Sequence, residues 1–361
     1  MLALALTTTL ALGADRPLVG AIRWDCWYGA GGPVAQVERS LGPRKFHWRL
    51  PFFGKVVADD QVSINGDSAE VMDREIAYAL QAGLDYWAFV DYGDEGDLTI
   101  GRRRYQEAKD KKGIRYCFIE EGGRFDSWGT KCFPRMVEQF KNADYLKVAG
   151  GRPLLFIFGR TTKLTKADFE ELARQTQAAG LARPYIAFMG WNPEADAKVI
   201  AELGFDAWSA YAKGVGYKGT MQPFETVARE VSERYWAECR RLGLPTVTFA
   251  STGWDTRPRQ EHPPTWIKGI EPIPDPTPAA QQQPQRDAVH ASPEQLAAHV
   301  KAAVDWTQAN PTLCPANAVI LYAWNENDEG GWLIPTLGEG DARIRALAGV
   351  LRPTAGPAPG P

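Results

Sequence analysis

Eight short runs of apolar, β-branched and aromatic residues recur along this sequence, and longer helical patterns separate them. Each run is apolar almost without interruption, which is typical of parallel strands that are covered on both faces. Eight strand–helix units in strict order predict an α/β protein, a single-domain (β/α)8 TIM barrel over residues 15–352. The runs are Leu18–Tyr28, Asp85–Tyr92, Ile114–Glu121, Pro153–Gly159, Tyr185–Trp191, Ala207–Ala212, Pro245–Asp255 and Ala318–Glu326.

The segments between the runs carry helix start and stop signals. In residues 68–83, apolar residues recur at helical spacing up to Gly83, a typical C-terminal stop. Ser292 followed by Pro293 is typical of an N-cap with proline in the first turn. The expected helices are Ser68–Gly83, Lys166–Gly180, Glu194–Gly204, Pro223–Gly243, Ser292–Ala309 and Asp341–Leu351.

A doubly wound open sheet is the main alternative to the barrel. That fold would need a Gly-rich phosphate-binding turn directly after its first strand. The first run here ends in WDCWYGAGG, and the sequence contains neither a GxGxxG motif nor a P-loop. The barrel is therefore the favoured fold.

Three segments fall outside the repeat. Residues 1–14 (MLALALTTTLALGA) are apolar and end in small residues, which predicts a signal peptide that lacks its basic n-region. We therefore expect a secreted or periplasmic protein; a frayed N-terminal strand is the alternative. Residues 256–293 form a Pro- and Gln-rich insertion on the catalytic face, either a lid or a mobile loop. The Pro/Gly-rich tail 353–361 is expected to be disordered.

Composition argues against several classes of function. The net charge of −3 gives no electrostatic reason to expect nucleic acid as a partner, and no segment predicts a membrane span. None of the five cysteines forms a CxxC pair, and none of the four histidines falls on an expected strand. We therefore expect no metal and no cofactor. A Ca²⁺ or Mg²⁺ site built from Glu326, Asp328 and Glu329 stays open as an alternative.

Carboxylates and aromatic side chains gather where the expected strands end. In a (β/α)8 barrel the reacting groups lie at the C-terminal strand ends. Carboxylates accept hydrogen bonds from sugar hydroxyls, and aromatic rings offer flat apolar faces. We expect the aromatic members of this set to supply at least two stacking platforms. The candidate substrate-binding residues are Trp24, Asp25, Trp27, Tyr28, Asp91, Tyr92, Glu120, Trp191, Tyr211, Trp254, Asp255, Arg259, Trp324 and Asn325.

Glu326 and Glu329 are the candidate catalytic residues. Residues three positions apart point to opposite faces of an extended strand, but they can converge where the strand turns into a loop. Two carboxyl groups in one site disfavour each other's ionised form, so one of them can act as an acid. Such a pair of carboxyl groups is what most glycoside hydrolases use to cleave a glycosidic bond.

Four stretches of the chain resemble the glycoside hydrolase family 99-like proteins, also called the WbsX-like group, which are related to endo-α-mannosidases and endo-α-mannanases. They run through most of the expected barrel, and the last is the most specific. The stretches are MDREIAYALQAGLDYWAFVDY (72–92), DYLKVAGGRPLLFIFG (144–159), TGWDTRPR (252–259) and AWNENDEGGWLIPT (323–336).

The resemblance implies a retaining mechanism without a carboxylate nucleophile. Glu326 would assist attack by the substrate 2-hydroxyl on C1, giving a 1,2-anhydro sugar, and Glu329 would be the general acid/base. Two departures from the group's pattern put the substrate in doubt more than the reaction: AIRWDCWYG at residues 21–29, and Asn327–Asp328 between the glutamates.

The sequence therefore predicts a secreted, cofactor-free glycoside hydrolase, endo-acting on an α-linked, α-mannan-like polysaccharide or oligosaccharide. Two alternatives stay open. A glycosyltransferase of polysaccharide biosynthesis is suggested by the label that the WbsX-like group has carried. A non-catalytic carbohydrate-binding barrel would share the aromatic strand ends, although both glutamates are present.

Overall fold

The computed structural model describes residues 16–215, 221–266 and 290–352 of the chain. The predicted signal peptide, the predicted tail and most of the insertion at 256–293 lie outside the described residues. The described part of that insertion holds a short helix, α10 (Arg257–Glu261).

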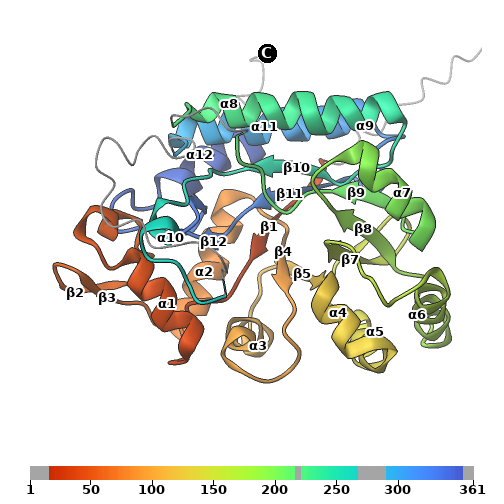
Figure 1. The fold of residues 1–361 in the computed structure, drawn as a ribbon, viewed down its shortest axis with the longest axis horizontal. Coiled ribbons are helices and arrows are strands. Elements are labelled where there is room, and N and C mark those ends of the chain that lie inside the picture. Colours follow the sequence, from red (N-terminus) through yellow and green to blue (C-terminus); the bar gives the residue numbers. More distant parts are fainter. Residues whose placement is uncertain (1–15, 216–220, 267–289, 353–361) are drawn as a thin grey trace, which may run out of the picture.

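Eight parallel strands form the centre of the molecule, and each overlaps one of the expected runs (Figure 1). Several strands end earlier than the apolar runs do, because the chain leaves the sheet before the site residues begin. The strands are β1 (Leu18–Arg23), β4 (Tyr86–Val90), β5 (Arg115–Glu121), β7 (Arg152–Phe158), β8 (Tyr185–Met189), β9 (Ala207–Ser209), β10 (Thr248–Ser251) and β11 (Ala318–Tyr322).

The strand order is that of a barrel. The sheet runs β10-β11-β1-β4-β5-β7-β8-β9, so each strand neighbours the next parallel strand in the chain, and β11 returns to β1. A parallel bridge between Trp208 and Thr246 joins β9 to the residues before β10. There the Val247 amide donates to the Trp208 carbonyl at 2.9 Å. This bridge closes the ring of strands, and the prediction of a single-domain (β/α)8 barrel is confirmed.

Helices cover the outside of the barrel, with α8 (Phe224–Val231), α9 (Ala237–Leu242) and α11 (Pro293–Ala309) together along the top of Figure 1. Three short strand pairs lie outside the barrel sheet or at its margin: β2 (Lys55–Ala58) with β3 (Gln61–Ser63), β6 (Lys147–Val148) with β7, and β12 (Asn325–Glu326) with β13 (Gly331–Trp332). The remaining α-helices are α1 (Gly32–Leu41), α2 (Ala69–Ala82), α3 (Ile100–Glu107), α4 (Gly122–Trp128), α5 (Phe133–Lys141), α6 (Lys166–Ala178), α7 (Pro193–Leu203) and α12 (Ala342–Leu351).

The residues expected to begin and end helices do so in the structure. The Ser68 hydroxyl accepts a hydrogen bond from the Val71 amide at 3.1 Å, and Gly83 ends α2 with φ of +89°. Ser292 and Gln295 form a capping box at the start of α11. The helix expected over 223–243 is not regular. It contains a π turn, η4 (Ser232–Trp236), between α8 and α9.

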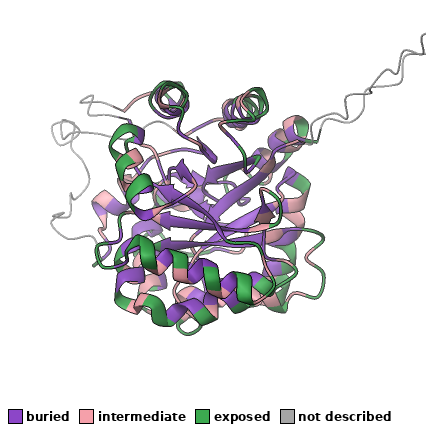
Figure 2. Ribbon diagram, turned by 90° about the vertical axis from the view of Figure 1, so that its right-hand side faces the viewer, coloured by how far each residue is buried: buried purple, intermediate pink, exposed green. Residues whose placement is uncertain are grey.

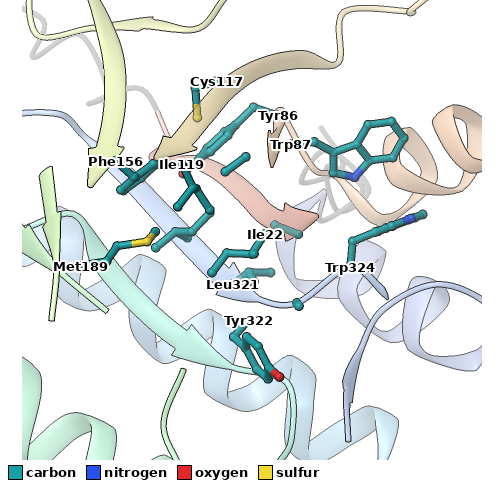
Figure 3. Close-up of a cluster of buried hydrophobic side chains, with 14 of the residues drawn as sticks. Ile22, Tyr86, Trp87, Cys117, Ile119, Phe156, Met189, Leu321, Tyr322 and Trp324 are labelled. Carbon is teal, nitrogen blue, oxygen red and sulfur yellow. The ribbon is translucent and has the colours of Figure 1, made fainter. Parts of the chain in front are cut away.

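The core has two layers, one inside the barrel and one between the strands and the helices (Figure 2). Apolar side chains fill the barrel interior, so the barrel is packed rather than open (Figure 3). All five cysteines are buried and unpaired, so no disulfide stabilises the fold. Each fully buried large apolar side chain contributes roughly 1.5–3 kcal/mol, which makes cross-links unnecessary for a core of this size.

The described helices give no candidate for a membrane span. None of them is both long enough and apolar enough to cross a bilayer.

Candidate active site

A cavity of about 460 Å³ opens at the C-terminal ends of the barrel strands. Both candidate catalytic residues line it, together with four of the predicted binding residues. Seven further lining residues were not predicted from the sequence. The predicted residues in the lining are Trp24, Tyr92, Tyr211, Arg259, Glu326 and Glu329, and the additional ones are Pro33, Val90, Leu98, Glu121, Arg124, Phe158 and Trp266.

A tight hairpin after β11 brings the two glutamates together. Glu326 ends β12 and pairs with Gly331 of β13 across the hairpin. The Glu329 amide donates to the Glu326 carbonyl at 3.0 Å, so positions i and i+3 lie on one side of a turn instead of on opposite faces of a strand. Gly330 makes this turn with φ of +85°, and a Cβ there would lie 2.2 Å from the Asp255 amide nitrogen. Only glycine fits that position.

One arginine joins three carboxylates beneath the cavity. Arg259, on α10, donates from Nε to Asp328 Oδ2 at 2.6 Å and from Nη2 to Glu326 Oε2 at 3.3 Å. Its Nη1 donates to Glu329 Oε1. The guanidinium therefore occupies the space between the three acidic side chains that were considered as a Ca²⁺ or Mg²⁺ site. Among the residues the structure describes, no group of three or more His, Cys, Asp or Glu is arranged to hold a metal ion.

Two tyrosines hold the glutamates in place. The Tyr211 hydroxyl donates to Glu326 Oε1 at 2.9 Å, and the Tyr322 hydroxyl donates to Glu329 Oε2. Glu326 is buried, whereas the Glu329 side chain keeps 17% of its surface exposed. Glu329 is thus the member of the pair that is more open to a ligand in the cavity.

The electrostatics of the pair favour one retained proton. Burial raises the pKa of Glu326 well above its usual value, and the charge of Glu329 raises it further. Arg259 acts in the opposite direction but does not cancel the rise. Glu326 therefore keeps its proton at pH values where an isolated glutamate is ionised.

Aromatic side chains form two walls of the cavity. On one side, the Trp24 indole donates to the Tyr92 hydroxyl at 2.7 Å, and the Arg259 guanidinium lies 4.9 Å from the Trp24 ring centre. On the other side, Phe158 and Tyr211 stack with ring centres 4.5 Å apart. The partly exposed faces of Trp24, Tyr92 and Tyr211 line the space between these walls.

Three of the predicted binding aromatics are instead part of the protein core. Trp27, Tyr28 and Trp324 are at most 1% exposed, so none of them offers a ring face to a ligand. The Trp324 indole donates to Glu75 Oε2 at 2.9 Å, and the Tyr28 hydroxyl donates to the other oxygen of Glu75. Their expected role as stacking platforms was wrong, because Tyr28 and Trp324 are bonded to Glu75 of α2 and Trp27 packs against Phe53, with ring centres 6.1 Å apart.

Trp191 and Trp254 lie outside the cavity but are not part of the core. Trp191 is 55% exposed at the end of β8. Trp254 is partly exposed and lies against Tyr322, with ring centres 5.6 Å apart. Neither ring lines the cavity.

Four predicted carboxylates are buried in ion pairs or against the helix layer and do not line the cavity. Asp25 pairs with Arg23 at 2.7 Å. Asp91 pairs with Arg135 of α5, and Glu120 is buried beside Asp91. Asp255 lies between Arg49 and Arg257. Successive residues of β5 point to opposite faces, so Glu120 points away from the cavity that Glu121 lines. The other three carboxylates follow their strands and are turned toward the arginines that pair with them.

The last predicted residue, Asn325, is a structural link. Its side-chain amide donates to the Trp24 carbonyl at 2.9 Å, and its oxygen accepts from the Trp24 amide at 3.0 Å. These two hydrogen bonds fix the hairpin to the end of β1. Strand alternation could have identified Glu121 instead of Glu120. Glu121 lies two residues after Ile119 on β5, so both side chains point to the inside of the barrel, where Ile119 is drawn in Figure 3.

Comparison with known proteins adds a family and a fold. The sequence model of the family described as "Glycosyltransferase WbsX" matches residues 124–347. The structure of the GH99 endo-α-mannosidase from Bacteroides thetaiotaomicron is 13% identical, covers 91% of this chain and 95% of that chain, and has a TM-score of 0.57. The structure of that enzyme in complex with BIS-TRIS-propane is 14% identical, covers 92% and 96%, and has a TM-score of 0.57. At these identities the likeness shows the fold. No curated protein matches the chain.

Proposed function

This chain belongs to the family described as glycosyltransferase WbsX. From that membership and from the geometry of the cavity, we propose that it is a retaining glycoside hydrolase that acts on an α-linked, α-mannan-like polysaccharide. The observation that carries the proposal is the convergence of Glu326 and Glu329 on Arg259 at the floor of an aromatic-walled cavity. Two carboxyl groups of unequal exposure, one of which keeps a proton, are suited to acid/base cleavage of a glycosidic bond.

In the first step, Glu326 removes the proton from the 2-hydroxyl of the sugar, and O2 attacks C1. The bond from C1 to the leaving oxygen breaks, and that oxygen takes a proton from Glu329. The product is a 1,2-anhydro sugar. A base with a raised pKa suits this task, because it holds the proton firmly once it has accepted it.

In the second step, Glu329 removes a proton from water, which attacks C1 and opens the three-membered ring. O2 then recovers its proton from Glu326. Two inversions at C1 give net retention, and both glutamates return to their starting states. The first step requires O2 and the leaving group to lie on opposite faces of the ring, as they do in α-mannosides.

One proton must be in the correct place when the substrate binds. Glu326 has to be ionised and Glu329 protonated, whereas burial favours the proton on Glu326 in the empty site. Tyr211 stabilises ionised Glu326 by donating to it, and Arg259 does so through its charge. We propose that a sugar seated over the more exposed Glu329 displaces water from it and moves the shared proton to that residue.

The proposal also includes secretion and degradation of extracellular polysaccharide, with residues 1–14 as signal peptide. It rests on the apolar character of those residues and on their small-residue end.

A glycosyltransferase is the second candidate, and the description of the family favours it. A transferase that uses a nucleotide sugar has to bind a diphosphate, which needs cationic or amide donors that are not already neutralised. In the cavity lining, Arg259 is paired with three carboxylates, and Arg124 pairs with Glu121 at 3.0 Å. This pairing favours hydrolysis over transfer from a nucleotide sugar.

The test is incubation of the purified protein with α-mannan, α-glucan and other polysaccharides, followed by sizing of the products. We expect internal cleavage of an α-linked polysaccharide by the wild-type protein and its near-complete loss in Glu329→Gln. Parallel incubations contain nucleotide sugars with oligosaccharide acceptors. Chain growth in those incubations, with no shortening of any polysaccharide, would replace hydrolysis by transfer as the function.

A further inference from the structure

We propose that Trp191 and the groove beside it form a distal subsite for an uncharged glycan, an inference that rests on the proposed function. A substrate chain would then run from the catalytic cavity across the exposed Trp191 ring onto the flank of the barrel. The distal subsite is defined here as Trp191 together with the groove-lining residues Asn192, Glu194, Lys213, Glu233 and Tyr235.

Trp191 is unusual among the large apolar side chains. It follows β8 at the catalytic end of the barrel and is 55% exposed, whereas most of the other tryptophans in the described part of the chain are buried or half-buried. An exposed indole costs free energy in water, because its apolar surface stays hydrated. A ligand with a flat apolar face would recover that free energy by stacking on the ring, and pyranose rings have such faces.

A groove of about 640 Å³ begins at Trp191. Its walls are the first turn of α7, the residues after β9, and the α8–η4–α9 helix. The Lys213 ammonium lies 3.0 Å from Glu230, which holds the residues after β9 against α8. The groove is as large as a typical small-molecule site, so it has room for sugar residues.

The helix that forms one wall of the groove departs from regular geometry there. The π turn η4 spans Ser232–Trp236, and three of its residues, Glu233, Arg234 and Tyr235, line the groove. A π turn inserts one residue into the helix and changes which side chains face outward, and such turns often occur at functional sites. Here the turn directs Glu233 and Arg234 to the groove while Tyr235 packs edge-on against Trp208, with ring centres 4.8 Å apart.

A continuous row of aromatic rings links the groove to the catalytic glutamates. Trp191 contacts Phe158 edge to face, with ring centres 5.9 Å apart, and Phe158 stacks on Tyr211 at 4.5 Å. Tyr211 in turn donates its hydroxyl to Glu326. Phe158 and Tyr211 line the cavity, while Trp191 lines the groove, so the two spaces share one aromatic wall. A glycan bound at Glu326 and Glu329 would reach Trp191 along this wall.

The charges in the groove select the chemistry of the ligand. Four glutamates and two cationic residues line it: Glu194, Glu230, Glu233 and Glu238, with Lys213 and Arg234. Carboxylates accept hydrogen bonds from sugar hydroxyls but repel the carboxylates of uronic acids. The ligand class is therefore a neutral glycan, and polyuronates are disfavoured.

The test is affinity electrophoresis in gels that contain α-mannan, dextran or galactomannan as neutral probes, and polygalacturonate as the anionic probe. The variants are Trp191→Ala and Glu233→Ala. Leu337→Ala is the matched control, because Leu337 is 48% exposed and lines neither the cavity nor the groove. Trp191→Phe keeps an aromatic face and serves as the conservative variant.

We expect at least one neutral polysaccharide, but not polygalacturonate, to retard the wild-type protein. Trp191→Ala should weaken that binding roughly five- to tenfold, since one stacked aromatic contributes on the order of 1 kcal/mol beyond burial. Trp191→Phe should restore most of it, Glu233→Ala should weaken it less, and Leu337→Ala should bind as the wild type does. Retardation of Trp191→Ala equal to that of wild type, or no retardation by any neutral polysaccharide, overturns the proposal.

Binding and cleavage can fail separately in this design. Trp191-dependent retardation without hydrolysis of any polysaccharide supports the distal subsite and rejects the proposed hydrolase. If a polysaccharide is cleaved, its oligosaccharides of increasing length provide a second readout. Trp191→Ala should then raise KM only for the longer oligosaccharides and leave kcat unchanged. An equal rise for the shortest cleaved substrate would place Trp191 in the catalytic cavity and overturn the proposal.

Discussion

Arg259 and Asp328 form a buried two-point ion pair, with Nε 2.6 Å from Oδ2 and Nη2 3.2 Å from Oδ1. Two parallel bonds fix the plane of the guanidinium. In that plane Nη1 and Nη2 reach Glu329 and Glu326. Asp328 is thus a positioning residue for the arginine that pairs with Glu326 and Glu329.

Asp328→Asn should shift the acid side of the pH–rate profile to lower pH. The Asp328 charge raises the pKa of Glu326, and Arg259 lowers it, so removing the Asp328 charge lowers that pKa. Glu326 then ionises at lower pH. The measurement is kcat/KM against pH on a substrate the wild type cleaves. Asp305→Asn, in an exposed pair with Lys301, is the control and should leave the profile unchanged. A shift to higher pH in Asp328→Asn contradicts the electrostatic role.

Glu329→Gln and Glu326→Gln should differ in their dependence on the leaving group. Loss of general acid/base assistance at Glu329 should slow cleavage of a natural polysaccharide by about 10²–10⁴-fold. An activated aryl α-glycoside should lose less, because its leaving oxygen needs little protonation. Glu326→Gln should slow both substrates alike, since attack by the 2-hydroxyl precedes either departure. Steady-state rates on both substrates decide this, and full activity in either variant removes the assignment.

Arg259→Met should destabilise the fold more at pH 8 than at pH 5. Removing one partner of a buried ionic cluster costs about 3–5 kcal/mol, because the remaining charges stay buried and unpaired. Without the guanidinium, the pKa of Glu326 rises further, so at low pH the carboxyl groups escape the penalty by taking up protons. Urea unfolding at the two pH values measures the difference. A loss that does not depend on pH would mean that packing of the side chain, not its charge, is what matters.

Glu120→Gln should raise the melting temperature at pH 8 and leave it nearly unchanged at pH 4. Burial raises the pKa of Glu120 well above its usual value, and Asp91 raises it further. The folded protein therefore keeps a proton that the unfolded chain releases, and stability falls as pH rises from the unfolded pKa toward the folded one. An amide avoids this loss and can donate to Asp91.

The gain should be about 1.4 kcal/mol for each pH unit that lies between the unfolded pKa of this carboxyl group and its raised folded pKa. Glu121→Gln is the matched control for thermal melts at both pH values, because Glu121 is the next residue and is exposed. A lower melting temperature for Glu120→Gln at pH 8 would show that Glu120 is ionised and stabilising in the folded protein.

Local patterns predicted the architecture because they are set by neighbours in the chain. The apolar runs predicted all eight barrel strands, and Ser68 and Gly83 mark the ends of α2 as expected. The π turn at Ser232–Trp236 was not predicted, because an inserted residue leaves the amphipathic pattern of a long helix nearly intact.

The residues that line the cavity were only partly predictable. Apolar runs alone do not show where each strand ends or which of its residues point to the inside of the barrel. Trp324 and Trp27 follow strands as predicted, but they pack into the core. Glu120 and Glu121 are adjacent, and only Glu121 faces the cavity. Phe158 and Arg124 line the cavity without a motif that marks them.

By itself, the sequence determined the barrel, the ends of helices such as α2, and the placement of Glu326 and Glu329 after the last strand, because periodicity and capping act over a few residues. Only the tertiary structure decided which strand-end side chains face the cavity, that Arg259 joins three carboxylates separated from it by about seventy positions, and that Trp191 remains exposed. Those outcomes depend on which face each residue takes when the strands close into a ring, and on how the loop after β10 crosses the hairpin after β11. Both are contacts between parts of the chain that no local pattern connects.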